Sequence, residues 1–153
     1  VPPADEDATL PWLLERAAAS VIRHNTSLLV IDPWNELDHA RPREMSQTEY
    51  VGAAIREMKK FAREFNIHLI VAAHPVKLAR DREGKVPMPS LYDISDSSHW
   101  ANKPDVGIII HREAQSTTTM RISKSRYHDK IGRPGEVKLT YVACTGRFEA
   151  AAA

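Results

Sequence analysis

The sequence has only one cysteine, Cys144, among its 153 residues. No intrachain disulfide can form, and no cysteine-based zinc site is available. The longest apolar runs, at 28–31 and 108–110, are far too short to cross a bilayer, and the N-terminus has no charged start followed by an apolar segment. These absences favour a protein of a reducing compartment, the cytoplasm, with no membrane partner.

Charge of one sign is scarce as well, because 21 lysines and arginines are matched by 20 aspartates and glutamates, for a formal net charge of +1. Any DNA contact must therefore come from a local basic segment. Hydrophobic residues make up 42% and charged residues 27%, which is ordinary for one globular domain. The chain begins with Val1 and an acidic run rather than with Met, so we expect the interior of a longer protein.

Hydrophobic periodicity predicts two helices. Residues 10–24 carry apolar side chains at helical spacing, and Asn25 follows them. A second apolar stripe begins after Ser46-Gln47-Thr48-Glu49 and ends at Asn66. That tetrapeptide is a capping-box pattern, in which the serine and glutamate side chains bond reciprocally to backbone amides.

Short apolar runs predict the strands. Residues 28–31 form a continuous run ended by Asp32-Pro33, which predicts a strand buried on both faces, and 68–73 and 106–111 follow as further apolar strands. Strand, helix and strand in succession predict a parallel α/β architecture with right-handed crossovers. Segments 117–123 and 136–142 have β-branched or alternating character and predict an antiparallel pair that closes one side of the sheet.

Two polar residues end the first two of these strands, Asp32 and His74. If the strands are parallel neighbours, both side chains lie at one rim, where ligands of open α/β sheets gather. The carboxylate can hold Mg²⁺ through water, and the neutral imidazole can orient water or contact a phosphate. The simpler interpretations are a polar residue that ends a buried strand and a histidine satisfied by backbone groups.

Two basic segments follow. Lys77, Arg80 and Lys85 lie in a loop directly after the second strand, where cations can follow DNA phosphates without reading sequence. Lys124 and Arg126 stand at the end of the strand that starts near residue 117, where paired cations can serve a nucleotide bound by a neighbouring subunit. Solvated surface charge is the alternative for both segments.

Taken in this order, the segments resemble the RecA-type core of DnaB-type hexameric replicative helicases, and more closely the Twinkle and phage primase–helicase branch. The resemblance covers roughly residues 10–149. Its most specific stretches are LLVIDPWNEL (28–37), LIVAAHPVK (69–77), LYDISDSSHWANKPDVGIIIHR (91–112), ISKSRYHDKIGRPGEVKLTY (122–141) and the closing GRF (146–148).

The resemblance implies an α/β fold, a three-layer RecA-like P-loop NTPase core with a mainly parallel sheet and C-terminal antiparallel strands, truncated before the phosphate-loop strand. Residues 1–149 would be the C-terminal part of a helicase ATPase domain, and 150–153 an alanine tail. It also implies ATP and Mg²⁺ as cofactors, single-stranded DNA and the chain's own subunits in a hexamer as partners, and a bacterial or phage-encoded cytoplasmic protein.

The same resemblance assigns roles to individual residues. Asp32 would be the Walker B aspartate on Mg²⁺, and His74 the sensor of the γ-phosphate. Arg126 would be the arginine finger and Lys124 its companion, both acting on ATP bound by the neighbouring subunit. The central-channel DNA loop would contain or adjoin Lys77, Arg80 and Lys85.

The sequence departs from the family pattern in three places. No G-x-x-x-x-G-K-[ST] occurs in the sequence. The catalytic glutamate, which the family places between the phosphate loop and the position of residue 1, is also absent. We therefore expect no ATP hydrolysis by this chain alone. Residues 93–98 read DISDSS where the family often has Asp-Leu-Arg-x-Ser-Gly. Because the family's phosphate-loop strand lies between the strands near Ile70 and Ile109, its loss should leave two strand edges or a closed-up sheet.

Two other functions compete with the helicase interpretation. Asp32, Asn35, Glu36, His39 and His74 could converge as ligands of Mn²⁺ or Zn²⁺ in a metal-dependent phosphohydrolase. Alternatively, the basic loop could serve a non-enzymatic module for DNA binding or oligomerisation.

Overall fold

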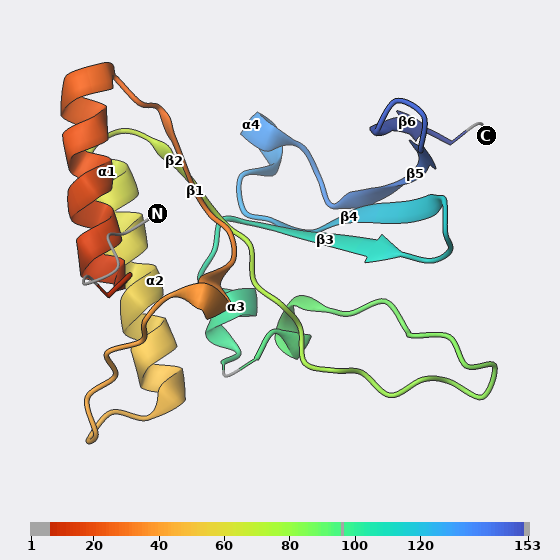
Figure 1. The fold of residues 1–153 in the computed structure, drawn as a ribbon, viewed down its shortest axis with the longest axis horizontal. Helices are drawn as coiled ribbons and strands as arrows, with labels where there is room; N and C mark the ends of the chain where they lie inside the picture. The colour runs from red at the N-terminus through yellow and green to blue at the C-terminus, as the bar shows by residue number, and fades with distance from the viewer. Residues whose placement is uncertain (1–6, 96, 152–153) are drawn as a thin grey trace. The chain divides into compact units, whose positions relative to one another are not determined.

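The computed structural model describes residues 7–95 and 97–151 (Figure 1). The chain divides between His74 and Pro75 into two compact units, which are described separately below. Helices are mixed with parallel and antiparallel strands, as the predicted α/β class requires.

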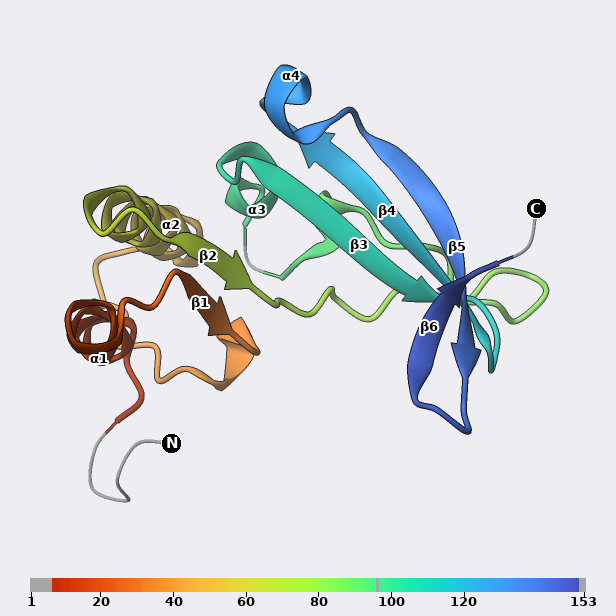
Figure 2. The ribbon, with the colours of Figure 1, turned by 90° about the horizontal axis from the view of Figure 1, so that it is seen from above.

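In its described residues, unit 1 contains two α-helices, one short 3-10 helix and a pair of parallel strands (Figure 2). In chain order its elements are α1 Leu10–His24, β1 Leu28–Ile31, the 3-10 helix η1 Trp34–Glu36, α2 Gln47–Glu64 and β2 His68–Val71. β1 and β2 pair in parallel from Leu28↔His68 to Ile31↔Val71. The first helix and first strand have the predicted bounds, and the second strand is two residues shorter than predicted.

The helix ends follow from local chemistry. At the start of α1, the Thr9 side chain accepts a hydrogen bond from the Trp12 amide at 3.4 Å, and Asn25 ends the helix in the left-handed conformation, with φ of 53°. The capping box predicted at the start of α2 is confirmed: Glu49 N–H donates to Ser46 Oγ at 3.3 Å, and Ser46 N–H donates to Glu49 Oε2 at 2.9 Å.

The core of unit 1 centres on α2, which contacts both α1 and β2. Its inward residues are almost fully buried, and Val51 has no exposed area. The remaining buried apolar side chains come from both helices and from the β1 region: Leu10, Leu14, Ile31, Trp34, Ala54, Ile55, Met58 and Phe61.

The prediction that 28–31 is buried on both faces is wrong. Leu28 and Val30 of β1 are 47% and 52% exposed, and Ile70 of β2 is 53% exposed, whereas Ile31 is buried. Helix α2 contacts β2, and more exposed and less exposed side chains alternate along β1. The alternating burial follows, because successive strand side chains point to opposite faces.

Unit 2 is built on an antiparallel sheet in the order β3-β4-β5-β6. Its elements are η2 Leu91–Asp93, α3 His99–Asn102, β3 Val106–Arg112, β4 Thr117–Ser125, α4 His128–Ile131, β5 Gly135–Val142 and β6 Arg147–Ala150. The predicted antiparallel pair is confirmed as β4–β5. The sequence did not predict α3, α4 or β6, and β6 extends one residue into the predicted alanine tail.

The strand predicted at 106–111 exists, but its partner differs from the parallel arrangement expected for it. β3 pairs antiparallel with β4, from Val106↔Ser125 to Arg112↔Thr118. Within the described residues, β2 and β3 are each an edge strand of a separate sheet. Two strand edges, rather than a closed-up sheet, were one of the two outcomes expected for a chain without the phosphate-loop strand.

Candidate active site

The carboxyl ends of β1 and β2 bring the first predicted pair of site residues to one edge. Asp32 directly follows β1, and His74 follows β2 after two residues. Because Ile31 and Val71 are the last parallel pair, the two segments leave the sheet side by side. The condition for a shared site, adjacent parallel strands ending at one rim, is therefore met.

Hydrogen bonds tie these two segments together beyond the ladder. Ala72 N–H donates to Ile31 O at 2.8 Å, and Trp34 N–H donates to Ala72 O at 2.8 Å. The side chain of Asn35 then accepts a hydrogen bond from His74 N–H, with 3.2 Å between Oδ1 and N. The backbone that carries His74 is thus fixed relative to the loop that carries Asp32.

Both candidate side chains are exposed. No hydrogen bond or ion pair to another described residue engages the Asp32 carboxylate. Such a carboxylate can bind the water shell of a divalent cation, and the imidazole can donate to or accept from an anion beside it.

The predicted DNA-contacting cations lie in a loop of unit 2 whose acidic residues organise it. Asp81 Oδ1 accepts from the amides of Glu83 and Lys85, both at 2.9 Å. Glu83 forms an ion pair with Lys85 at 2.9 Å. Arg80 donates to Gly84 O at 2.6 Å, which closes the loop, while Lys77 is exposed near its start.

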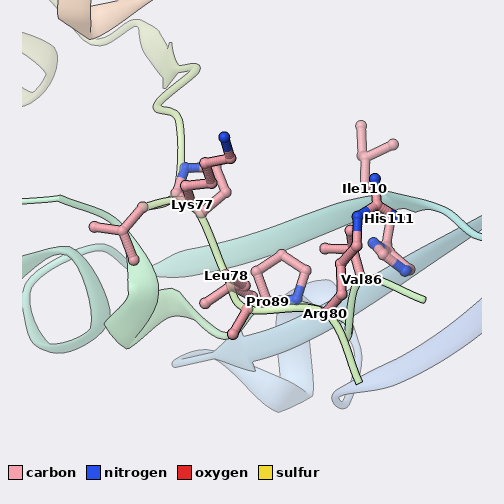
Figure 3. Close-up of a pocket in the computed structure, with 10 residues that line it drawn as sticks. Lys77, Leu78, Arg80, Val86, Pro89, Ile110 and His111 are labelled. Carbon is pink, nitrogen blue, oxygen red and sulfur yellow. The ribbon is translucent and has the colours of Figure 1, made fainter. Parts of the chain in front are cut away.

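A cavity of about 610 Å³ lies beside this loop (Figure 3). Its walls are mainly apolar and come from the loop and from β3. The lining residues are Pro75, Val76, Lys77, Leu78, Ala79, Arg80, Val86, Pro89, Ile110 and His111. Two of the three predicted DNA-binding cations therefore line one hollow, and Lys85 does not.

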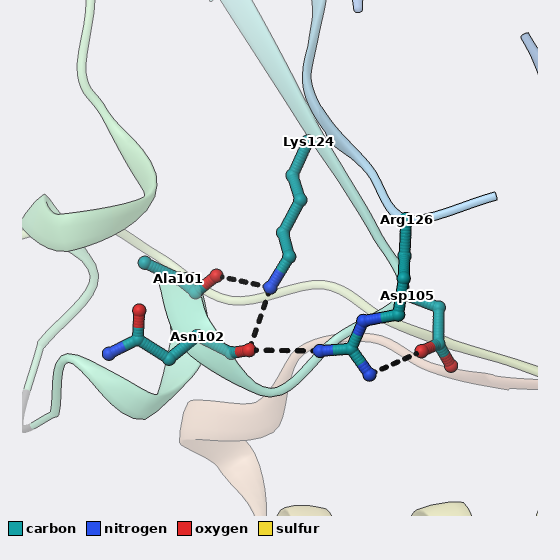
Figure 4. Close-up of polar contacts among 5 residues, drawn as sticks. All are labelled: Ala101, Asn102, Asp105, Lys124 and Arg126. Atoms are coloured by element: carbon teal, nitrogen blue, oxygen red, sulfur yellow. Dashed lines mark hydrogen bonds and ion pairs between the residues drawn. The ribbon is translucent and has the colours of Figure 1, made fainter. Parts of the chain in front are cut away.

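The other cationic pair lies at the end of β4 (Figure 4). Lys124 Nζ donates to the carbonyl oxygens of Ala101 and Asn102, both at 2.7 Å. Arg126 pairs with Asp105 at 3.1 Å and donates to Asn102 O at 3.3 Å. The structure therefore brings Lys124 and Arg126 together on the C-terminal turn of α3.

Comparison with known proteins places this arrangement in a family. The family model described as DnaB-like helicase C terminal domain matches residues 5–150. The chain belongs to that family. It is 38% identical over 149 residues to the Twinkle homolog protein, chloroplastic/mitochondrial, of Arabidopsis thaliana; the match covers 94% of this chain and 21% of that protein.

A solved structure confirms the RecA-type α/β fold. It is a DnaB-like replicative helicase, described together with its interactions with primase, and it superposes with a TM-score of 0.68 at 19% identity. The match covers 92% of this chain and 34% of the solved one. The chain thus spans about a fifth to a third of these relatives.

The named relative is chloroplastic and mitochondrial, so a bacterial or phage origin and a cytoplasmic location stay predictions for this DnaB-like domain. No helix in the described part of the chain has the length and apolar character needed to span a membrane.

The segment at 93–98, where the sequence departs from the family pattern, begins with a capped turn. Ser90 N–H and the Ser90 hydroxyl donate hydrogen bonds to the Asp93 carboxylate, and these bonds hold the pKa of the Asp93 carboxyl below its usual value. Asp96 of this segment lies outside the described residues.

One predicted ligand of the metal-dependent phosphohydrolase, His39, packs among aromatic side chains. The His39 ring centroid lies 4.5 Å from that of Trp34, with the rings tilted by 40°, and His39 Nδ1 lies 3.4 Å from the Tyr50 hydroxyl. Burial, with a smaller contribution from Glu57, raises the pKa of Tyr50. Within 7–95 and 97–151, no group of three or more His, Cys, Asp and Glu side chains is arranged to hold a metal ion.

Sequence reasoning missed Trp34 and Asp105 and considered Asn35 only as a metal ligand, yet all three residues shape the sites of this DnaB-like domain. Trp34 is 3% exposed and anchors the loop after Asp32 in the core, Asn35 binds the His74 backbone, and Asp105 pairs with Arg126. A tryptophan directly after Asp-Pro was the one visible signal. Nothing in the sequence marks the contacts of Asn35 and Asp105, because both depend on the path of a loop.

Proposed function

We propose that this chain is part of the ATP-dependent motor domain of a replicative DNA helicase and works with a phosphate-binding loop supplied by another segment of the protein. Family membership and the RecA-type fold support this assignment. The observation that carries it is the parallel β1–β2 pair, whose shared edge holds Asp32 and His74.

Asp32 is proposed to hold Mg²⁺ of Mg-ATP through water. Its exposed carboxylate at the end of β1, without a described partner, fits that role. Bound Mg²⁺ neutralises charge on the phosphates. His74 is proposed to contact the γ-phosphate, and the Asn35 hydrogen bond keeps its backbone in register with Asp32.

The basic loop is proposed to contact single-stranded DNA. Lys77 and Arg80 supply positive charge at the apolar cavity, and Lys85 lies next to them in sequence with its charge partly offset by Glu83. Cations bind phosphates of any sequence, as a translocating motor requires.

Lys124 and Arg126 are proposed to act on ATP bound by a neighbouring subunit of a hexamer. An arginine donated across a subunit boundary stabilises transition-state charge, and it is worth on the order of 10³–10⁵ in rate where it operates. The C-terminal turn of α3 presents both cations together.

ATP turnover tests the nucleotide site. The chain by itself should show no hydrolysis above background, because it has no backbone cradle for the phosphates. A longer version that supplies G-x-x-x-x-G-K-[ST] should hydrolyse ATP, and Asp32→Ala should abolish the Mg²⁺-dependent rate. Turnover by the short chain that Asp32→Ala removes would contradict the need for another segment.

Binding to single-stranded DNA tests whether the basic loop contacts DNA or serves only oligomerisation. For single strands, log K falls with log salt with a slope of about −0.7 per phosphate contact. Lys77→Ala with Arg80→Ala should weaken binding and make the slope shallower by about 1.4. Lys60→Ala with Arg63→Ala, which removes two exposed cations from α2, is the matched control and should leave the slope unchanged.

A further inference from the structure

Asp105 lies where α3 gives way to β3, in the turn between Asn102 and Val106. Val106 and Ser125 form the last pair of the antiparallel β3–β4 ladder. One step beyond it, Arg126 N–H donates to Asp105 O at 2.9 Å. Asp105 and Arg126 are therefore direct cross-strand neighbours, whose side chains lie close enough to interact.

The Arg126 guanidinium is held at two points in this arrangement. Nη1 pairs with Asp105 Oδ1 at 3.1 Å, and Nη2 donates to Asn102 O at 3.3 Å (Figure 4). Guanidinium has five N–H donors in a rigid plane, so two anchors fix its orientation and leave others unused. Among the described residues, no other partner engages Arg126.

The Asn102 carbonyl oxygen is shared by the two cations. It accepts from Lys124 Nζ at 2.7 Å as well as from Arg126. Lys124 lies near the end of β4 and Arg126 directly follows the strand, and both side chains reach the same carbonyl. The last carbonyl groups of a helix have no hydrogen-bond partner within the helix, and here those of Ala101 and Asn102 accept hydrogen bonds from the two cations.

The ion pair is poorly suited to a purely structural role. Its side chains are 43% exposed at Arg126 and 38% exposed at Asp105, and exposed pairs add little to stability. The same sheet holds a second pair of the same kind, Arg121 with Glu136, at 2.8 Å and with 44% and 45% exposure. That pair bridges two strands and has no helix end beside it.

We infer that Asp105 is a positioning residue: it holds the Arg126 guanidinium against the C-terminal turn of α3, with donors left over for the phosphates of a nucleotide on a second copy of the chain. The inference rests on the proposed role of Arg126. Asp105 would act only through that guanidinium and would not touch the nucleotide.

A double-mutant cycle in the complete hexameric helicase tests this. Arg126→Ala should lower kcat for ATP hydrolysis by on the order of 10³-fold or more. Asp105→Ala should lower kcat by about 10- to 100-fold with KM little changed, because the arginine is present but misplaced. The double variant should be no slower than Arg126→Ala alone, since a residue that acts through another adds nothing once that other is gone.

Two further variants separate positioning from folding. Glu136→Ala removes the matched ion pair and should leave kcat unchanged. Asp105→Glu keeps the charge on a longer side chain and should recover part of the lost rate. The melting temperature should fall by no more than roughly 2–4 °C for Asp105→Ala.

Each contrary outcome has a distinct meaning. If Arg126→Ala is slow and Asp105→Ala is normal, the positioning role is wrong and the proposed function stands. If the two losses multiply, Asp105 acts independently of Arg126 and the inference fails. A faster Asp105→Ala enzyme would show that Asp105 restrains the arginine instead, and a normal Arg126→Ala rate would overturn the arginine's role along with the inference.

Discussion

Single residues set the geometry of both candidate sites, and they do so through backbone contacts. Asn35 accepts from His74 N–H, and Lys124 and Arg126 both bind the Asn102 carbonyl. Such contacts depend on residue type as well as on loop path. A substitution that preserves the bonding atom should therefore preserve the site.

Asn35 provides a direct test at this scale. Asn35→Ala removes the acceptor of the 3.2 Å bond, so the His74 amide should exchange with solvent faster, in line with a bond worth about 0.5–1.5 kcal/mol. Asn35→Asp keeps an oxygen at the same position and should retain most of the protection. Hydrogen exchange followed by NMR measures both, with the Ala72 amide, bonded to Ile31 O, as the internal control. Equal exchange of His74 in all three proteins would mean that Asn35 does not hold this segment.

The limit of sequence reasoning is clearest among these residues. That Asp32 and His74 would share an edge followed from one rule, that neighbouring parallel strands end together, and the strand pairing confirms it. Trp34 and Asp105 were not assigned a role, and Asn35 was considered only as a metal ligand, because each acts on a residue that only the folded loops bring near. Their contacts span different elements and leave no periodic signal.

At the scale of elements, local patterns were reliable where the chemistry is local. The bounds of α1 and β1 and the capping box of α2 follow from spacing and from one tetrapeptide. The second face of β1 was misjudged, because burial there depends on what packs over Val30 rather than on its apolar character. β6 was not predicted, because it has only four residues, Arg147–Ala150, and forms by pairing with β5 across a turn.

The α2 capping box predicts a pH-dependent stability. The hydrogen bonds from Ser46 hold the pKa of the Glu49 carboxyl below its usual value. A depressed folded pKa contributes stability above the unfolded pKa, and this contribution is lost as the pH falls through the folded value. Ser46→Ala removes the N-cap oxygen, a change that typically lowers the free energy of unfolding by about 1 kcal/mol at pH 7. Because Ser46→Ala also removes one hydrogen bond to the Glu49 carboxylate, the difference should shrink as that carboxylate is protonated below about pH 4.

Urea denaturation at a series of pH values measures this. Ser123→Ala is a suitable control, since Ser123 is exposed on β4 and should change stability by less than about 0.5 kcal/mol. A Ser46→Ala deficit that stays constant from pH 7 to pH 3 would show that the Glu49 carboxylate takes no part in the cap.

At the scale of the whole molecule, the chain exposes apolar strand faces in both units. Val30 and Ile70 are 52% and 53% exposed in unit 1, and Ile108 and Ile110 are 53% and 72% exposed in unit 2. β2 and β3 are also edge strands of their sheets among the described residues. Apolar faces next to unpaired edges favour association between copies.

We therefore predict that the isolated chain self-associates with rising concentration, and that β3 contributes to it. Ile108→Lys with Ile110→Lys should lower the weight-average mass seen by sedimentation, because two charges would have to be desolvated in any contact at this face. Folding should survive, since both side chains are already solvent-exposed. Ile22→Lys is the matched control: Ile22 is 77% exposed and belongs to helix α1 rather than to a strand, and its replacement should leave the mass unchanged. If association persists in the β3 variant but is lost with Ile22→Lys, the contact involves helix α1 rather than β3. If the unmodified chain is a monomer at all concentrations, neither strand face mediates association.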